Sequence, residues 1–391
     1  MKPVKISYLR YWPFVKTLFT GQAPVPPYLI FFVTHRCNAR CGHCFNWQFA
    51  AARPKTSELT LSEIERIARG YGPLMFLFLT GGEPFIRKDL AEIAAAFHNY
   101  CGLIKIQIPS NGYFCDRIPN VMTKILEKCP RTHCSVTLSL DAVGSEHDKI
   151  RQVKGLFERV SESYRSLKLI EKHNPLFSVN IEVTISRKNQ DYLPRLISFL
   201  EQEWGVKNIL CPLIRGHPRD PATKEVDIQK YQAFVNQIKN DLYTGKIYGY
   251  QGFAFARLAT AKDTLARETV LNTILEPREY YPCQAGNLAA VLLANGDVLP
   301  CELKSEIMGN LKTSLYSFPD LLAQPKAKEI RASIIKEKCF CTHECFLTTN
   351  LLFNPKAMLK IIGRTLLFSA RSNRIFQGIT SRAPKKNQPH N

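Results

Sequence analysis

The chain has 391 residues, of which 45% are hydrophobic and 22% are charged, and its formal net charge is +20. This length and composition provide a large core with room for one large and one smaller domain, which excludes a disordered protein. No apolar run reaches the roughly 18 to 20 residues of a membrane-spanning helix, and 5–19 is too interrupted for a signal peptide. We therefore place the chain in the reducing cytoplasm, where its thirteen cysteines indicate metal binding and not disulfides.

The positive charge is concentrated at the two ends of the chain. No Asp or Glu precedes Glu58 and none follows Glu344, while each of these end segments carries eight Lys or Arg. Such ends attract an acidic protein, a nucleic acid or an anionic membrane surface. Solvated basic ends without a partner are the alternative.

Between residues 28 and 213, apolar runs typical of strands alternate with segments of helical period. The predicted strands are 28–34, 74–80, 103–109, 134–140, 177–185 and 206–213, and the predicted helices are 61–69, 89–98, 121–128, 156–171 and 193–203. Six such repeats predict a parallel sheet, either open and doubly wound or closed into a partial barrel. In both architectures ligands bind at the carboxyl ends of the strands.

Three cysteines with the spacing C-x3-C-x2-C, Cys37, Cys41 and Cys44, directly follow the first predicted strand. Three thiolates on one short loop can hold three irons of a [4Fe-4S] cluster and leave the fourth iron open for a substrate or cofactor. A zinc knuckle completed by His35, His43 or a distant residue is the alternative.

Polar motifs follow the next three predicted strands, and they include Gly81, Gly82, Glu83, Pro84, Asn111, Ser139, Asp141 and Arg151. Paired glycines let the backbone approach a ligand closely. A hydroxyl and a carboxylate two residues apart share one strand face and can hydrogen-bond a ribose diol, and an arginine can bind a carboxylate. A tight turn, a helix N-cap at Asp141 and a surface arginine are the alternatives.

Beyond residue 220 the alternation stops. Helices are predicted at 227–242 and 254–265, and a hairpin with an Asn-Gly turn joins 289–293 to 298–300. The hairpin lies between Cys283 and Cys301, and a second group of three cysteines follows, Cys339, Cys341 and Cys345. These five can hold one cluster, with zinc as the alternative. The other five cysteines are expected to be buried small hydrophobes.

The tail over 351–368 has the pattern of a basic amphipathic helix, which can dock on the barrel or lie on an anionic membrane. Residues after about 377 are expected to be disordered.

The cysteine loop and the Gly-Gly-Glu-Pro segment resemble those of the radical S-adenosylmethionine (radical SAM) superfamily. The resemblance implies a partial (β/α)6 TIM-like barrel, that is, an α/β fold. It also implies a [4Fe-4S] cluster on Cys37, Cys41 and Cys44 that binds SAM. Gly81 to Pro84 would meet the SAM amino group, and the end of the fourth strand would meet its ribose and methionine. His43 departs from the pattern, since these enzymes commonly carry an aromatic residue there.

The C-terminal cysteines resemble the SPASM and twitch domains, small α+β domains that carry auxiliary [4Fe-4S] clusters. The resemblance implies one auxiliary cluster held by Cys283, Cys301 and Cys345, with Cys341 preferred over Cys339 as the fourth ligand. The predicted domains are a basic N-terminal segment over 1–26, a radical SAM partial barrel over 27–220, a helical linker over 221–280, the auxiliary cluster domain over 281–350 and a basic amphipathic tail over 351–391.

The function implied by the resemblance is reductive cleavage of SAM to a 5′-deoxyadenosyl radical, which takes hydrogen from a peptide, a lipid-linked compound or a small molecule. A reduced flavodoxin or ferredoxin would supply the electron. Only about 27 residues precede the first predicted strand, so a peptide substrate would need a separate recognition partner. A non-catalytic iron–sulfur or zinc protein that binds nucleic acid through its basic ends is the competing hypothesis. We expect no specific nucleic-acid partner, but a peripheral contact with an anionic membrane fits the basic ends.

Overall fold

The computed structural model describes residues 11–52, 58–206, 209–244, 249–250 and 255–380. Its described strands form one sheet in the order β6-β5-β4-β3-β2-β1-β7-β8-β9. Strands β1 to β7 pair in parallel, and β8 and β9 add an antiparallel edge. The strands are β1 Tyr28–Thr34, β2 Phe76–Gly81, β3 Lys105–Ser110, β4 His133–Ser139, β5 Phe177–Glu182, β6 Ile209–Leu210, β7 Ala289–Leu292, β8 Asp297–Leu299 and β9 Gly309–Asn310. The predicted α/β partial barrel is confirmed.

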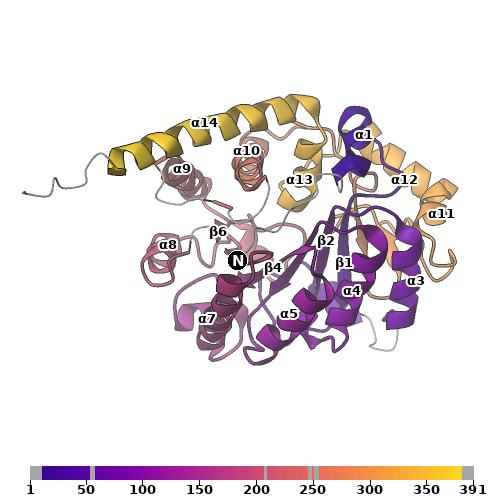
Figure 1. Ribbon diagram of the computed structural model, residues 1–391, viewed down its shortest axis with the longest axis horizontal. Helices are drawn as coiled ribbons and strands as arrows, with labels where there is room; N and C mark the ends of the chain where they lie inside the picture. The colour runs from indigo at the N-terminus through magenta and orange to yellow at the C-terminus, as the bar shows by residue number, and fades with distance from the viewer. Residues whose placement is uncertain (1–10, 53–57, 207–208, 245–248, 251–254, 381–391) are drawn as a thin grey trace, which may run out of the picture.

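Helices lie on both sides of this sheet. Figure 1 shows α3, α4, α5 and α7 on one side and α9, α10, α13 and α14 on the other. The α-helices are α1 Trp12–Thr20, α2 Trp47–Ala52, α3 Leu61–Tyr71, α4 Leu90–Cys101, α5 Arg117–Lys128, α6 Ser145–Arg151, α7 Leu156–His173, α8 Leu193–Gln202, α9 Ile228–Thr244, α10 Ala256–Leu275, α11 Phe318–Ala323, α12 Pro325–Lys336, α13 Glu344–Leu352 and α14 Pro355–Thr380. Short 3-10 helices are η3 Pro84–Ile86 and η4 Pro221–Lys224.

Strand β1 lies inside the sheet between β2 and β7, and all seven of its residues are buried. A strand covered on both faces needs apolar side chains at every position, which explains its unbroken apolar run. Leu29, Phe31 and Val33 pack into the larger core below the outer helices. Tyr28, Ile30 and Phe32 belong to a second core cluster, which also contains residues of β7, α12 and α13. The C-terminal segment therefore packs directly on the inner face of the barrel.

Several predicted elements differ from the structure. The helix predicted at 254–265 continues to Leu275 as α10. Among the described residues of the predicted strand 206–213, only Ile209 and Leu210 form β6, with an isolated bridge from Ile185 to Leu213 beyond it, and residues 207–208 lie outside the described part of the chain. The predicted tail helix is two helices, because the chain breaks at Phe353–Asn354 and Pro355 begins α14. Proline suits the first turn of a helix but cannot continue one.

Helix α14 packs on α10 through Ala357 and Ile361. It extends to Thr380, past the expected start of disorder at 377, and the remainder of that prediction lies outside the described residues. No described helix combines the length and the apolar character needed to cross a membrane.

Candidate functional site

The loop between β1 and α2 carries the first three cysteines. Cys37 is exposed, Cys44 is half-buried and Cys41 is buried. Among the described residues, no three cysteine thiols lie within 4.8 Å of one another. Metal binding requires the thiolate form of these residues, so it would displace their protons.

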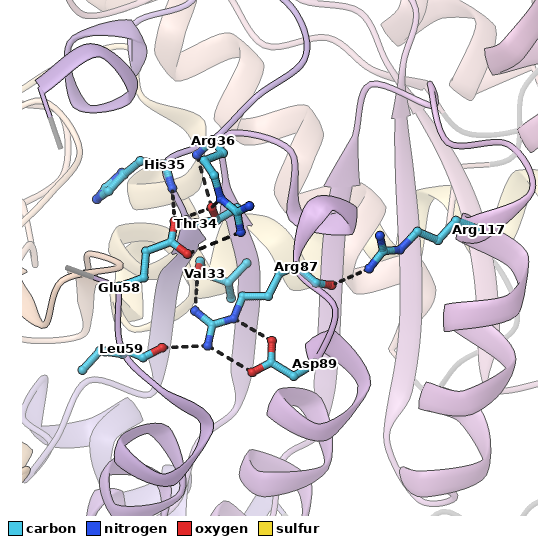
Figure 2. A network of polar contacts seen from close by, with 9 residues as sticks. All are labelled: Val33, Thr34, His35, Arg36, Glu58, Leu59, Arg87, Asp89 and Arg117. Carbon is cyan, nitrogen blue, oxygen red and sulfur yellow. Dashed lines mark hydrogen bonds and ion pairs between the residues drawn. The ribbon is translucent and has the colours of Figure 1, made fainter. Parts of the chain in front are cut away.

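Buried polar contacts fix the base of this loop (Figure 2). The Thr34 hydroxyl donates to Glu58 Oε1 at 2.5 Å. The guanidinium of Arg87 donates to the carbonyls of Val33 and Leu59 at 2.8 and 2.7 Å. These bonds hold the segment of Glu58 and Leu59, which precedes α3, and the segment of Arg87, which follows β2, at the end of β1. Sequence reasoning missed Arg87 and Glu58, although Glu58 is the first acidic residue of the chain and follows a long basic segment.

Gly81 and Gly82 lie where β2 meets the end of β1. A Cβ on Gly81 would lie 2.1 Å from the Thr34 carbonyl oxygen, and one on Gly82 would lie 2.1 Å from that of Arg36. Gly81 also has a φ of +127°, which disfavours other residues. The glycines are therefore required by the close approach of two backbone segments, and the ligand contact expected from the sequence is not needed to explain them. Pro84 follows as the first residue of η3.

Glu83 joins the carboxyl ends of β2 and β3. Its carboxylate accepts hydrogen bonds from the Ser110 hydroxyl at 2.9 Å, the Asn111 amide at 2.8 Å and the Phe85 amide at 3.2 Å. Burial raises the pKa of Glu83 to about 7, although these hydrogen bonds oppose the shift. The side-chain amide of Asn111 lies 3.9 Å from Cys37 Sγ. Glu83 thus holds Asn111 against the cysteine loop.

Asp141 and Arg151 form a buried ion pair beside the loop. Arg151 Nε donates to Asp141 Oδ2 at 2.6 Å, and another guanidinium nitrogen lies 3.9 Å from Cys41 Sγ. Burial opposes ionisation of Asp141, but the charge of Arg151 outweighs it and lowers the pKa of this carboxyl. His43 Nε2 lies 3.8 Å from Asp141, and burial lowers the pKa of His43 to about 4. The pair places one fixed positive charge next to Cys41.

The alternatives for these two residues do not hold. Helix α6 has Gly144 as its N-cap, so Asp141 is not a cap. Arg151 is 8% exposed and is not a surface residue. Ser139 is buried at the end of β4.

The C-terminal cysteines lie in two places. Cys283 donates a hydrogen bond to the thiol of Cys339, and this bond lowers the pKa of Cys339 to about 7. The charge of Cys339 raises the pKa of Cys301 and of Cys341. Cys345 instead accepts from the Tyr28 hydroxyl, and its sulfur lies within 4.8 Å of ligand atoms of Glu302 and His343. The structure brings four of the five cysteines together and points the fifth toward the barrel interior.

A cavity of about 330 Å³ lies inside the barrel, between the inner faces of β2 to β5 and helices α10 and α13. Its volume falls within the range of small-molecule sites. Glu182, Arg215 and Cys345 line it on the side of the cysteine loops, and most of its wall is apolar.

Comparison with known proteins identifies two family matches. The radical SAM superfamily matches residues 31–200, and the SPASM iron–sulfur cluster-binding domain matches residues 283–346. Fe-coproporphyrin III synthase of Methanosarcina barkeri is 32% identical over 45% of this chain and 41% of its own length, so the match spans less than half of that relative. Pre-heme d1 synthase of Dinoroseobacter shibae is 27% identical over 81% and 80%. The fold is similar to that of Streptococcus suis SuiB bound to S-adenosylmethionine, with a TM-score of 0.55 and 17% identity over 82% of this chain and 71% of SuiB.

Proposed function

The chain belongs to the radical SAM superfamily and carries a SPASM domain, and on that premise we propose that it abstracts hydrogen from a substrate held in the barrel cavity. When a [4Fe-4S] cluster and SAM are bound, reductive cleavage of SAM supplies a 5′-deoxyadenosyl radical for this step. The observation that supports the proposal is that the loop of Cys37, Cys41 and Cys44 follows the carboxyl end of β1, and that Arg215 of the cavity wall lies over the ring of Phe45, the residue after Cys44, at 5.0 Å.

The side chains around the loop have separate tasks in this proposal. Cys37, Cys41 and Cys44 are the cluster ligands. Arg151, fixed by Asp141, stabilises the Cys41 thiolate and presents its charge to a carboxylate, such as that of SAM. Asn111 contacts the loop at Cys37, and Glu83 sets the position of Asn111. Gly81 to Pro84 and Ser139 remain proposed SAM contacts.

We assign the auxiliary cluster to Cys283, Cys301, Cys339 and Cys341, which replaces Cys345 with Cys339 in the expected ligand set. The grouping of these four thiols and the separate hydrogen bond from Tyr28 to Cys345 support the assignment. Iron analysis of reconstituted variants tests it. We expect Cys339→Ala to lose about half of the iron and Cys345→Ala to keep all of it. Loss of iron in Cys345→Ala with retention in Cys339→Ala would reverse the assignment.

The finer statements about partners are also proposals. We propose that a reduced flavodoxin or ferredoxin donates the electron near the exposed Cys37, and that the protein works in the reducing cytoplasm. The similar proteins bear the names of different synthases and of a peptide-bound enzyme, so they do not favour one substrate.

Binding of SAM to the reconstituted protein tests the site. The reduced protein should show an electron paramagnetic resonance signal that changes when SAM is added. In Arg151→Met that has been reconstituted to the wild-type iron content, the apparent affinity for SAM should fall by about tenfold or more, because a charge-assisted contact is lost. Lys188→Met, which removes a half-exposed charge paired with Asp220, is the matched control. A spectrum that SAM leaves unchanged in the wild type would contradict the proposal.

A further inference from the structure

The barrel cavity has two chemically different ends. The end nearest the cysteine loop holds Glu182, on which the charges of Arg151 and Asp141 act, and Arg215, which lies over the ring of Phe45 next to Cys44. The opposite end lies at the amino ends of β3 and β4, where Lys105 and Arg131 line the cavity with Lys262 of α10. Between them the wall is formed largely by apolar side chains, among them Tyr28, Phe76, Phe78, Leu210 and Pro212.

The basic end reaches the surface of the molecule. Tyr11 and Phe255 line the cavity and contact each other edge to face, with ring centroids 5.4 Å apart. Phe255 is 50% exposed, and Arg131 is exposed as well. The opening therefore lies where α1 and α10 begin, with Leu352 at the end of α13 also in its wall.

The charges at this end are arranged to meet an anion. Lys105 and Lys262 repel each other, and burial together with this repulsion lowers the pKa of Lys105 to about 8. His133 beside Lys105 is neutral, because burial lowers its pKa to about 3. Asp263 faces these residues and forms an ion pair with Lys262, Glu344 also lines the cavity, and the Lys105 ammonium lies 5.3 Å from the centroid of the Tyr250 ring. An anion between the two lysines would relieve their repulsion.

The helices next to the opening expose apolar and basic side chains together. On α14, Leu359, Leu366 and Leu367 are 72%, 65% and 56% exposed, and Lys356 and Lys360 share this outer face. The opposite face of α14 is already packed on α10.

On α1, Trp12 and Phe19 are 72% and 83% exposed, with Lys16 on the same face. No acidic residue occurs in either helix. Exposed aromatic and aliphatic side chains among lysines, without a carboxylate, are typical of helices that lie in the interface of an anionic bilayer.

We propose that the substrate is an anionic amphiphile taken from a membrane surface on which α1 and α14 rest. Its phosphate or carboxylate lies between Lys105 and Lys262 at the opening, and its apolar chain extends along Phe76 and Phe78 toward Arg215. The C–H bond to be attacked is then in the chain, near the cysteine loop. This inference rests on the proposed function for the reaction. Binding of the amphiphile and of the membrane can nevertheless be measured without the reaction.

Calorimetric titration of the reconstituted protein with dodecyl phosphate tests the cavity. Two comparison probes are used: dodecanol lacks the phosphate head group, and inorganic phosphate lacks the alkyl chain. We expect dodecyl phosphate to bind at least about tenfold more tightly than either, since it alone combines a hydrogen bond to a charged lysine with burial of the chain. Lys105→Met should remove this advantage and leave dodecanol binding unchanged, and Lys105→Arg should restore it. Equal binding of dodecanol and dodecyl phosphate, or no effect of Lys105→Met in a folded variant, would overturn the proposal.

Co-sedimentation with vesicles tests the surface. The wild type should bind phosphatidylcholine vesicles only when they contain phosphatidylglycerol, and added salt should release it. Leu359→Glu with Leu366→Glu should abolish binding, whereas Leu169→Glu on α7, where the side chain is 66% exposed, should not change it. Binding that is absent in the wild type, or equal in all variants, would refute the membrane contact.

The two levels of inference fail separately. If the wild type cleaves SAM but binds neither dodecyl phosphate nor anionic vesicles, the amphiphile assignment is wrong and the radical reaction stands. If it binds both but SAM does not bind or react, the proposed function is wrong and the cavity ligand stands.

Discussion

Replacing Asp141 with asparagine tests the buried ion pair that orients Arg151. Asp141 is fully buried, the Arg151 side chain is 10% exposed, and their nitrogen and oxygen are 2.6 Å apart. Asparagine keeps the shape and an oxygen for the Thr184 amide, which now bonds to Asp141 at 3.0 Å. It leaves the buried guanidinium charge uncompensated, and removing one partner of such a pair costs about 3–5 kcal/mol.

Thermal unfolding followed by circular dichroism measures this effect. A loss of 1 kcal/mol lowers the unfolding midpoint by about 2–4 °C in chains of 150–250 residues, and by less in a longer chain. We therefore expect the midpoint of Asp141→Asn to fall by about 5–10 °C. Glu225→Gln is the control, because Glu225 pairs with Arg187 while both side chains are more than half exposed, and such pairs contribute about 0–1 kcal/mol. A midpoint in Asp141→Asn that moves no more than in the control would refute the reasoning.

The same pair has a pH signature. The folded state lowers the pKa of Asp141 below its unfolded value of about 3.9, so the stabilisation is present at neutral pH and is lost as the pH falls below about 4. The difference in unfolding midpoint between Asp141→Asn and the wild type should therefore become smaller at acidic pH.

Two further predictions concern other parts of the site. Gly82→Ala should reduce the iron bound by the first cysteine loop, because the new Cβ would lie 2.1 Å from the Arg36 carbonyl oxygen. Gly363→Ala has no neighbour within 4 Å of the new Cβ and should instead stabilise α14 by about 0.5–1 kcal/mol. Iron analysis measures the first effect, and thermal melts measure the second. Lys105 has a folded pKa of about 8 against about 10.4 unfolded, so the unfolded chain binds more protons between these values and stability should rise with pH across this window. Lys105→Met should flatten that rise, and an unchanged slope in melts from pH 8 to 10 would contradict the burial of this charge.

Much of the fold was predictable because the barrel strands are buried on both faces. The apolar run at 28–34 coincides with β1, and the Asn-Gly turn correctly placed the hairpin of β7 and β8. Strand β6 was overestimated because its run includes Pro212, and only two residues pair within the strand. Apolar composition alone does not determine where a ladder ends.

The parts of the site whose residues lie close together in the sequence were predictable. Cys37, Cys41 and Cys44 share one loop, so their spacing carries the information. Contacts that position this loop join residues far apart in the sequence, such as Thr34 with Glu58, 24 positions away, and Arg87 with Val33, 54 positions away. No periodicity or spacing encodes such pairs. The separation of Cys345 from the other C-terminal cysteines likewise depends on how α13 packs against Tyr28.

The most direct test of the central claim is the quantity of 5′-deoxyadenosine formed under anaerobic conditions by the reconstituted protein with SAM and dithionite. The wild type and Cys115→Ala, which changes a buried cysteine outside both cysteine groups, should form it, and Cys37→Ala should form none. No product from the wild type with both clusters loaded, or equal product from Cys37→Ala, would contradict the assignment of SAM cleavage to this loop.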